Sequence, residues 1–159
     1  MITRDEAHDL IAREGMFLDA RRWDEWLSLF TEDVTYWVPA WADEVTPTSD
    51  PQRELSLIHY QGRHNLEDRV WRLKSGLSIA STPLVRTSHM TSNILVDADG
   101  RVHASFTVHC YNARLQHSHL FFGHYAYELR AEGAAWKIAK KTTTLLNDCI
   151  PAVADIYML

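Results

Sequence analysis

The stretch RTSHMTSNILVDADGRVHASFTVHCYNARLQHSHLFFGHYAYELRAEGAAWKIAKKTTTLLN, residues 86–147, decides the fold. Its apolar residues alternate with polar ones, which is the period of a half-buried strand. Turn signals interrupt this alternation, among them Asp99-Gly100 and Glu132-Gly133. The pattern predicts an antiparallel meander of four consecutive strands, over 86–96, 102–115, 120–131 and 135–147, with a turn at 116–118 in the middle.

The predicted meander has one face for a core and a second face that also carries apolar residues. One side of the second strand is apolar throughout and consists of Val102, Ala104, Phe106, Val108 and Cys110. The other face of the sheet is rich in aromatic and small polar residues. We therefore expect that face to make a second buried contact, either as the wall of a pocket or with a partner.

Three helices are predicted before the meander. Thr3 and Glu6 form a capping box, and the apolar spacing behind it continues to about Asp19. The second and third helices are predicted over 22–30 and 66–75, the third with Asn65 as its N-cap.

Shorter elements complete the first half. They are a strand over 34–39, a loop over 42–51 and a connection over 76–83. Residues 54–60 fit a strand or a helix, and the sequence favours a short strand. Helices followed by a long antiparallel sheet make an α+β pattern.

Composition bounds the class of protein. The chain has 159 residues, a formal net charge of −5 and 46% hydrophobic residues. This length favours one domain over residues 1–159, and this composition excludes a disordered chain. The acidic balance argues against a dedicated nucleic-acid binder, and no apolar run approaches the ~20 residues of a membrane helix. The N-terminus lacks a signal-peptide core, so we expect a cytoplasmic protein.

Nine histidines raise the question of a metal site. Glu54, His59 and His64 have the residue types of a two-histidine, one-carboxylate iron site. On a helix, however, five residues turn through ~500° and leave the two rings ~140° apart. We therefore expect loop or surface histidines, and solvated turn residues at His117 and His119.

A Rieske cluster needs two Cys and two His in paired short motifs. The chain has two cysteines, Cys110 and Cys149, and neither has a histidine two or three residues after it. The sequence thus excludes such a cluster in this chain and predicts buried thiols in a reducing compartment. Motifs for a serine nucleophile, a phosphate loop and a dinucleotide site are absent from the sequence.

An acid/base site inside a curved sheet remains an alternative. The candidate inward positions are Tyr36, His89, Asn93, His109 and Tyr125. A histidine beside an Asp or Tyr can abstract a proton from a small substrate. Alternate positions of any half-polar strand give the same pattern, so buried or interface histidines held by hydrogen bonds are the competing interpretation.

Several segments together resemble the small β subunit of ring-hydroxylating Rieske dioxygenases, in the benzoate, toluate and anthranilate branch. They are RRWDEWLSLFTEDVTYWVP (21–39), DPQRELSLIHY (50–60), LEDRVWRL (66–73), RTSHMTSNI (86–94) and KKTTTLLNDCIPAVADIYML (140–159). The resemblance covers most of the chain from about residue 7, and it is weakest over 98–135.

This resemblance implies a cone-shaped, cystatin-like (nuclear transport factor 2-like) α+β fold, shared with scytalone dehydratase and ketosteroid isomerase. It also implies a larger α subunit that carries the Rieske [2Fe–2S] cluster and a mononuclear Fe(II), with electrons from NADH through a separate reductase. The complex is commonly an α3β3 hetero-hexamer that acts in the catabolism of aromatic compounds.

Two functions are therefore consistent with the sequence. The first is a noncatalytic subunit of an aromatic-carboxylate dioxygenase, with no catalytic, cofactor-binding or metal residue in this chain. The second is a stand-alone lyase or isomerase that does acid/base chemistry in the cavity of the cone.

Overall fold

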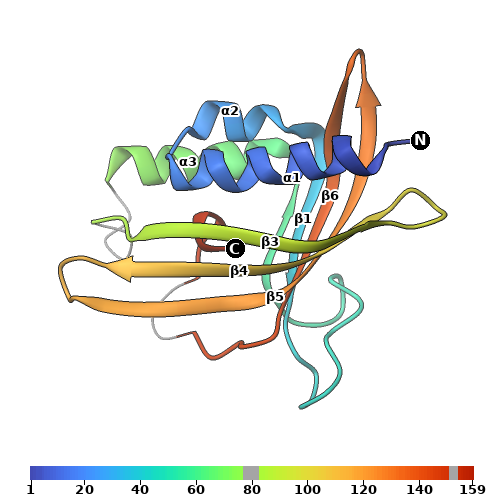
Figure 1. The fold of residues 1–159 in the computed structure, drawn as a ribbon. Helices are drawn as coiled ribbons and strands as arrows, with labels where there is room; N and C mark the ends of the chain where they lie inside the picture. Colours follow the sequence, from blue (N-terminus) through green and yellow to red (C-terminus); the bar gives the residue numbers. More distant parts are fainter. Residues whose placement is uncertain (77–82, 151–153) are drawn as a thin grey trace.

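Six strands form one twisted sheet, and three helices lie against one of its faces (Figure 1). The structure is a computed structural model, and it describes residues 1–76, 83–150 and 154–159. The helices are α1 (Arg4–Asp19), α2 (Trp23–Ser28) and α3 (Arg63–Ser75). The strands are β1 (Phe30–Pro39), β2 (Ser56–Gln61), β3 (Arg86–Val96), β4 (Val102–Asn112), β5 (His117–Glu132) and β6 (Ala135–Leu145), and a short 3-10 turn, η2 (Ile156–Met158), follows.

The predicted meander is confirmed. The strand order in the sheet is β2-β1-β6-β5-β4-β3, so β3 to β6 are neighbours in chain order and pair antiparallel. The first hairpin, β1–β2, joins the sheet through a parallel pairing of β1 with β6. This parallel pairing brings residues near position 36 next to residues near position 141, and it places both halves of the chain around one interior.

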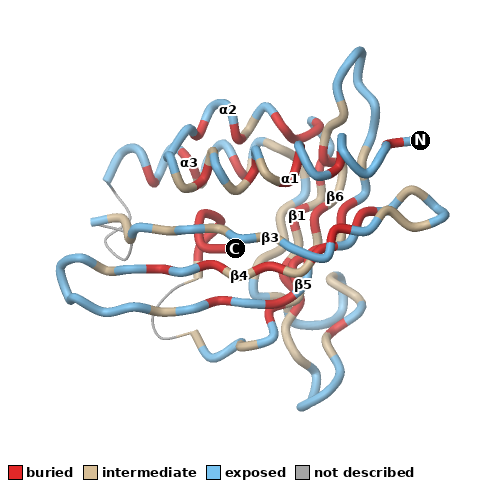
Figure 2. Tube along the Cα trace, in the orientation of Figure 1, coloured by how far each residue is buried: buried red, intermediate tan, exposed pale blue. Residues whose placement is uncertain are grey.

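The core lies between the helices and the near face of the sheet. Along β4 and β5, buried residues alternate with exposed or half-buried ones, as the red and blue segments of Figure 2 show. The five residues predicted to face inward from β4, from Val102 to Cys110, are all buried. No helix covers the far face of the sheet in the described part of the chain (Figure 1).

The local signals at α1 are confirmed. The Thr3 hydroxyl accepts a hydrogen bond from the Glu6 amide at 3.2 Å, and the Glu6 carboxylate accepts one from the Thr3 amide at 2.7 Å. These two bonds satisfy amides that the first turn leaves without helical partners.

Several predicted boundaries are wrong. The second helix ends at Ser28, and β1 already begins at Phe30 instead of residue 34. The third helix begins at Arg63, because Gly62, with φ of +86°, turns the chain directly from β2 into the helix. The Asn65 side chain therefore lies inside the helix, where its amide donates to the Gln61 carbonyl instead of capping.

The turn between β4 and β5 is also displaced from the predicted 116–118 to 113–116. The Asn112 side chain accepts hydrogen bonds from the amides of Arg114 and Leu115, at 3.1 and 3.0 Å. This local bonding starts the turn early, and Gln116 ends it at a φ of +51°. Most of the connection predicted over 76–83 lies outside the described residues. Among the helices that the structure describes, none is long and apolar enough to cross a membrane.

Candidate functional site

The space between the helices and the curved sheet, which we call the interior of the cone, contains a buried ion pair. Glu14 projects from α1 and Lys141 from β6, and the two residues are 2% and 1% exposed. The Lys141 ammonium donates to one Glu14 carboxylate oxygen at 2.9 Å, and the Tyr127 hydroxyl donates to the other at 2.8 Å. Buried charges persist in a protein when they are paired and hydrogen-bonded, as these are.

Three tyrosine rings surround the ammonium group. The Lys141 nitrogen lies 5.5, 4.2 and 5.8 Å from the ring centres of Tyr36, Tyr125 and Tyr127. Burial raises the pKa of all three phenols well above the usual value of 10.0, so they stay protonated at neutral pH. Burial also lowers the pKa of Lys141, while the Glu14 carboxylate opposes that effect.

The C-terminal segment, residues 154–159, fills the rest of this interior. The main-chain oxygen of Leu159 accepts hydrogen bonds from Lys141 at 3.2 Å and from the Tyr36 hydroxyl at 3.4 Å. Asp155, which is 2% exposed, pairs with Arg69 of α3 and caps η2 at the Ile156 amide. The segment is therefore tied to both β6 and α3.

Little space remains beside the ion pair. A cavity of about 10 Å³ lies among Glu14, His89, Tyr125 and Lys141. A volume of that size holds at most one water molecule, whereas ligand pockets measure about 300–1,000 Å³. The arrangement has acids and bases in contact, and the cavity that the described residues leave beside them has no room for a substrate.

A second polar pair lies at the edge of the same cavity. His89 Nδ1 lies 2.6 Å from one carboxylate oxygen of Asp19, whose other oxygen accepts from the His89 amide at 2.9 Å. Thr87 also donates to Asp19, at 2.9 Å. Burial raises the pKa of this carboxyl, but the bonds from His89 and Thr87 outweigh burial and leave the pKa below its usual value.

Three of the five predicted inward residues are therefore inward, and two are not. Tyr36, His89 and Tyr125 line the interior. Asn93 and His109 are exposed, so their prediction is wrong. His109 alternates with the inward Val108 and Cys110, and Asn93 sits in an irregularity of β3 at a φ of +55°.

The candidate iron ligands do not come together. Glu54 accepts hydrogen bonds from the amides of Ser49 and Asp50, both at 2.7 Å, and so closes its own loop. His59 lies on β2, and the His64 ring contacts the Asn65 side chain at 3.1 Å. Within residues 1–76, 83–150 and 154–159, no group of three or more His, Cys, Asp or Glu side chains is arranged to hold a metal ion.

The remaining histidine and cysteine predictions have mixed outcomes. His117 is exposed, as predicted, but His119 lies inside β5 with its ring against Phe121, at 4.4 Å between centres. Cys110 is buried, and burial raises the pKa of its thiol to about 11. Cys149 is exposed, so the prediction of two buried thiols is wrong for this residue.

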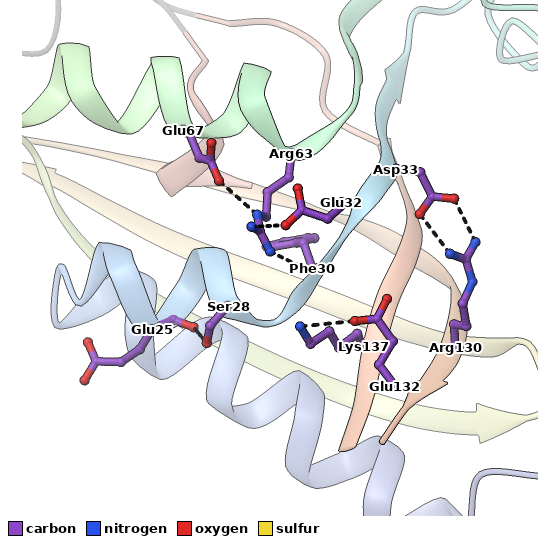
Figure 3. A network of polar contacts seen from close by, with 10 residues as sticks. All are labelled: Glu25, Ser28, Phe30, Glu32, Asp33, Arg63, Glu67, Arg130, Glu132 and Lys137. Carbon is purple, nitrogen blue, oxygen red and sulfur yellow. Dashed lines mark hydrogen bonds and ion pairs between the residues drawn. The ribbon is translucent and has the colours of Figure 1, made fainter. Parts of the chain in front are cut away.

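A second polar network lies on the surface near the start of β1 (Figure 3). Arg63 pairs with Glu32 and Glu67, and Arg130 pairs with Asp33 at 2.9 Å. The Arg130 guanidinium lowers the pKa of Asp33 to about 2. These charges pair with one another and connect α3, β1 and β5, so the network is suited to holding elements together.

Comparison with known proteins decides the family. A family model described as the ring hydroxylating beta subunit matches residues 13–152. This chain belongs to the ring-hydroxylating β-subunit family. The small subunit of 2-halobenzoate 1,2-dioxygenase from Burkholderia cepacia is 40% identical over 149 residues, which are 92% of this chain and 90% of that relative. The β subunit of toluate 1,2-dioxygenase from Pseudomonas putida is 39% identical over 158 residues, 98% of each.

Solved structures agree with this family assignment. The crystal structure of the β subunit of benzoate 1,2-dioxygenase from Burkholderia mallei matches with a TM-score of 0.80 and 32% identity, over 100% of this chain and 99% of that one. A candidate scytalone dehydratase from Novosphingobium aromaticivorans has a TM-score of 0.66 at 16% identity, covering 96% and 91% of the two chains, which shows the fold alone. The predicted cystatin-like α+β fold is confirmed.

Sequence reasoning missed the central pair of this β subunit. Glu14 continues the buried stripe of α1 formed by Leu10, Ile11 and Leu18, and Lys141 occupies an inward position of β6 two residues before Thr143. The sequence signal for this pair was one charged residue on the buried face of α1 and another on the buried face of β6, because a buried charge needs a partner. The two residues are 127 positions apart, so their contact depends on the tertiary fold.

Proposed function

We propose that this chain is a structural, noncatalytic β subunit of a Rieske non-haem iron oxygenase that hydroxylates an aromatic carboxylate. The observation that carries the proposal is the filled interior: among the described residues, the Glu14–Lys141 pair and residues 154–159 leave a cavity of about 10 Å³ beside the pair. The similarity to 2-halobenzoate, toluate and benzoate dioxygenase subunits supports both the reaction class and the substrate class.

In this proposal the redox groups belong to a larger α subunit. That subunit carries the Rieske [2Fe–2S] cluster and the mononuclear Fe(II), and NADH supplies electrons through a reductase. In this proposal residues 1–159 form one cytoplasmic domain that contributes no catalytic, cofactor-binding or metal residue. Its role is to hold the α subunits of an α3β3 hexamer at the spacing that electron transfer between neighbouring subunits needs.

The stand-alone lyase or isomerase is not favoured. Such an enzyme must admit its substrate to the acid/base groups, and here those groups already bond to one another and to Leu159. A larger surface groove of about 370 Å³ lies between α1 and the β5–β6 turn, with Arg13, Trp136 and Lys137 in its wall. The charged side chains of this groove are already engaged, because Lys137 pairs with Glu132 at 3.2 Å and Arg13 pairs with Asp9 in a largely exposed ion pair. The groove therefore does not favour the lyase or isomerase.

Co-expression with a Rieske α subunit tests the proposal. We expect one complex that contains both chains, takes up oxygen with a benzoate-type substrate and contains iron, while the folded β subunit purified alone is colourless and iron-free. The measurements are native mass, metal analysis and oxygen uptake. Stoichiometric iron in the isolated folded chain, or an α subunit that stays separate from it at micromolar concentration, contradicts the proposal.

A further inference from the structure

Two residues that line the small cavity beside the ion pair each bury a polar atom without a hydrogen-bond partner. One atom is Nε2 of His89, whose side chain is 4% exposed, and the other is the hydroxyl oxygen of Tyr125, which is 3% exposed. Neither atom has a partner among the residues that the structure describes. A buried donor or acceptor without a partner costs free energy, so the great majority of such groups are paired in folded proteins. The cavity that both residues line is where a shared partner can lie.

The Tyr125 hydroxyl lies between the two polar pairs of the interior. The Tyr125 ring stacks on Phe106, with 4.1 Å between the ring centres and an interplanar angle of 8°, and this contact fixes the direction of the ring. Burial raises the pKa of the phenol, and the charges of Glu14 and Asp19 raise it further, so the oxygen lies within electrostatic reach of both carboxylates. The phenol therefore keeps its proton and has a hydrogen bond to donate.

The two unpaired atoms have complementary roles in hydrogen bonding. His89 Nδ1 lies 2.6 Å from the Asp19 carboxylate, so Nδ1 carries the proton of the uncharged ring and Nε2 is an acceptor. The Tyr125 hydroxyl is a donor, but no direct bond joins it to His89. A water molecule both accepts and donates, so it can satisfy the two atoms together. The cavity measures about 10 Å³, which corresponds to one water molecule and excludes a larger one.

We infer that one water molecule is bound in this cavity, where it accepts a hydrogen bond from the Tyr125 hydroxyl and donates one to His89 Nε2. Buried waters typically make about three hydrogen bonds. Glu14 and Lys141 also line the cavity and can supply the third. The Lys141 ammonium has three donors, of which two are directed at Glu14 and Leu159.

The bridging water extends the polar bonds that hold α1 to the sheet. The Asp19–His89 pair connects the end of α1 to β3, which is an edge strand of the sheet. The Glu14–Lys141 pair connects the middle of α1 to β6. Through the water, the bonds of His89 continue to Tyr125 on β5, between these two attachments. The inference goes beyond the proposed function, because it holds whether or not the chain acts in an oxygenase.

Magnetic relaxation dispersion of water oxygen-17, which detects long-lived buried water molecules, tests this inference on the full chain. Tyr125→Phe removes the donor and keeps the ring on Phe106. Tyr111→Phe is the matched control, because Tyr111 lies on β4 and is 37% exposed. We expect a long-lived water with the same residence time in wild type and Tyr111→Phe. In Tyr125→Phe its residence time should fall roughly 10-fold, since the water loses one of its hydrogen bonds.

A crystal structure of the wild-type chain, at a resolution that shows ordered water, gives a readout that needs no variant to fold. We expect a single water peak within hydrogen-bond distance of both His89 Nε2 and the Tyr125 hydroxyl. A dry cavity, or a direct bond between the two side chains, contradicts the inference. An unchanged residence time in Tyr125→Phe, with a wild-type circular dichroism spectrum, contradicts it as well.

Discussion

We expect Lys141→Met to lower the free energy of unfolding by about 3–5 kcal/mol, because it leaves the buried Glu14 carboxylate without its cation. The change also removes a donor to the Leu159 main-chain oxygen. Urea unfolding followed by tryptophan fluorescence measures the loss.

Two further variants serve as controls for the Lys141→Met prediction. Lys140→Met removes the neighbouring lysine, whose side chain is 39% exposed and lies 3.5 Å from Glu128, so its cost should stay below about 1 kcal/mol. The double variant Glu14→Leu/Lys141→Met removes both charges and should recover part of the lost stability, because apolar residues replace a buried ion pair at little cost. Recovery is partial because the Tyr127 hydroxyl and the Leu159 oxygen still lose their partners. Equal losses in Lys140→Met and Lys141→Met contradict the assignment of Lys141 to a buried pair.

Asp155→Ala should lower the free energy of unfolding by about 2–4 kcal/mol. The change breaks the bond from Arg69 Nε at 2.8 Å and removes the side-chain cap of η2 at the Ile156 amide. The estimate is below that for Lys141 because the Arg69 side chain is 19% exposed and water can solvate it. Thermal or urea unfolding measures the change.

Asp148→Ala is the matched control for Asp155→Ala, because Asp148 is exposed just after β6. We expect a loss of less than about 0.5 kcal/mol there. Limited carboxypeptidase digestion adds a second readout, since release of residues 154–159 should quicken only in Asp155→Ala. Equal digestion of both variants contradicts the view that Asp155 holds this segment in the cone.

The order of β3 to β6 in the sheet was predictable because its signals are local. Alternation along β4 and the turn residues Asp99-Gly100 act within a few positions of the strands that they define. The turn after β4 was misplaced. The Asn112 side chain bonds to the amides of Arg114 and Leu115 and ends the strand pairing early, and the alternation of apolar and polar residues carries no signal of these bonds.

The interior was only partly predictable. Inward positions such as Tyr36 and Tyr125 follow from strand alternation, but the parallel pairing of β1 with β6 has no local signal. That pairing decides that Lys141 lies beside Tyr36 and across from Glu14. The contact of residues 154–159 with this pair likewise joins segments that the sequence separates, so the filling of the cone could be learned only from the structure.

Turnover per mole of assembled complex is the most direct test of the claim that this subunit is structural. Alanine variants of five histidines on or near the sheet are compared with wild type in iron-loaded complex, by oxygen uptake and native mass together. They are His59, His64, His89, His109 and His124. We expect each to retain the chemistry, and a buried one such as His89 to lower only the yield of complex, at a cost of ~1–3 kcal/mol for a partner group left unpaired. A ~10³-fold loss of turnover in fully assembled, iron-loaded complex, the size typical of a direct catalytic group, contradicts the structural role and returns the cone interior to consideration as an active site.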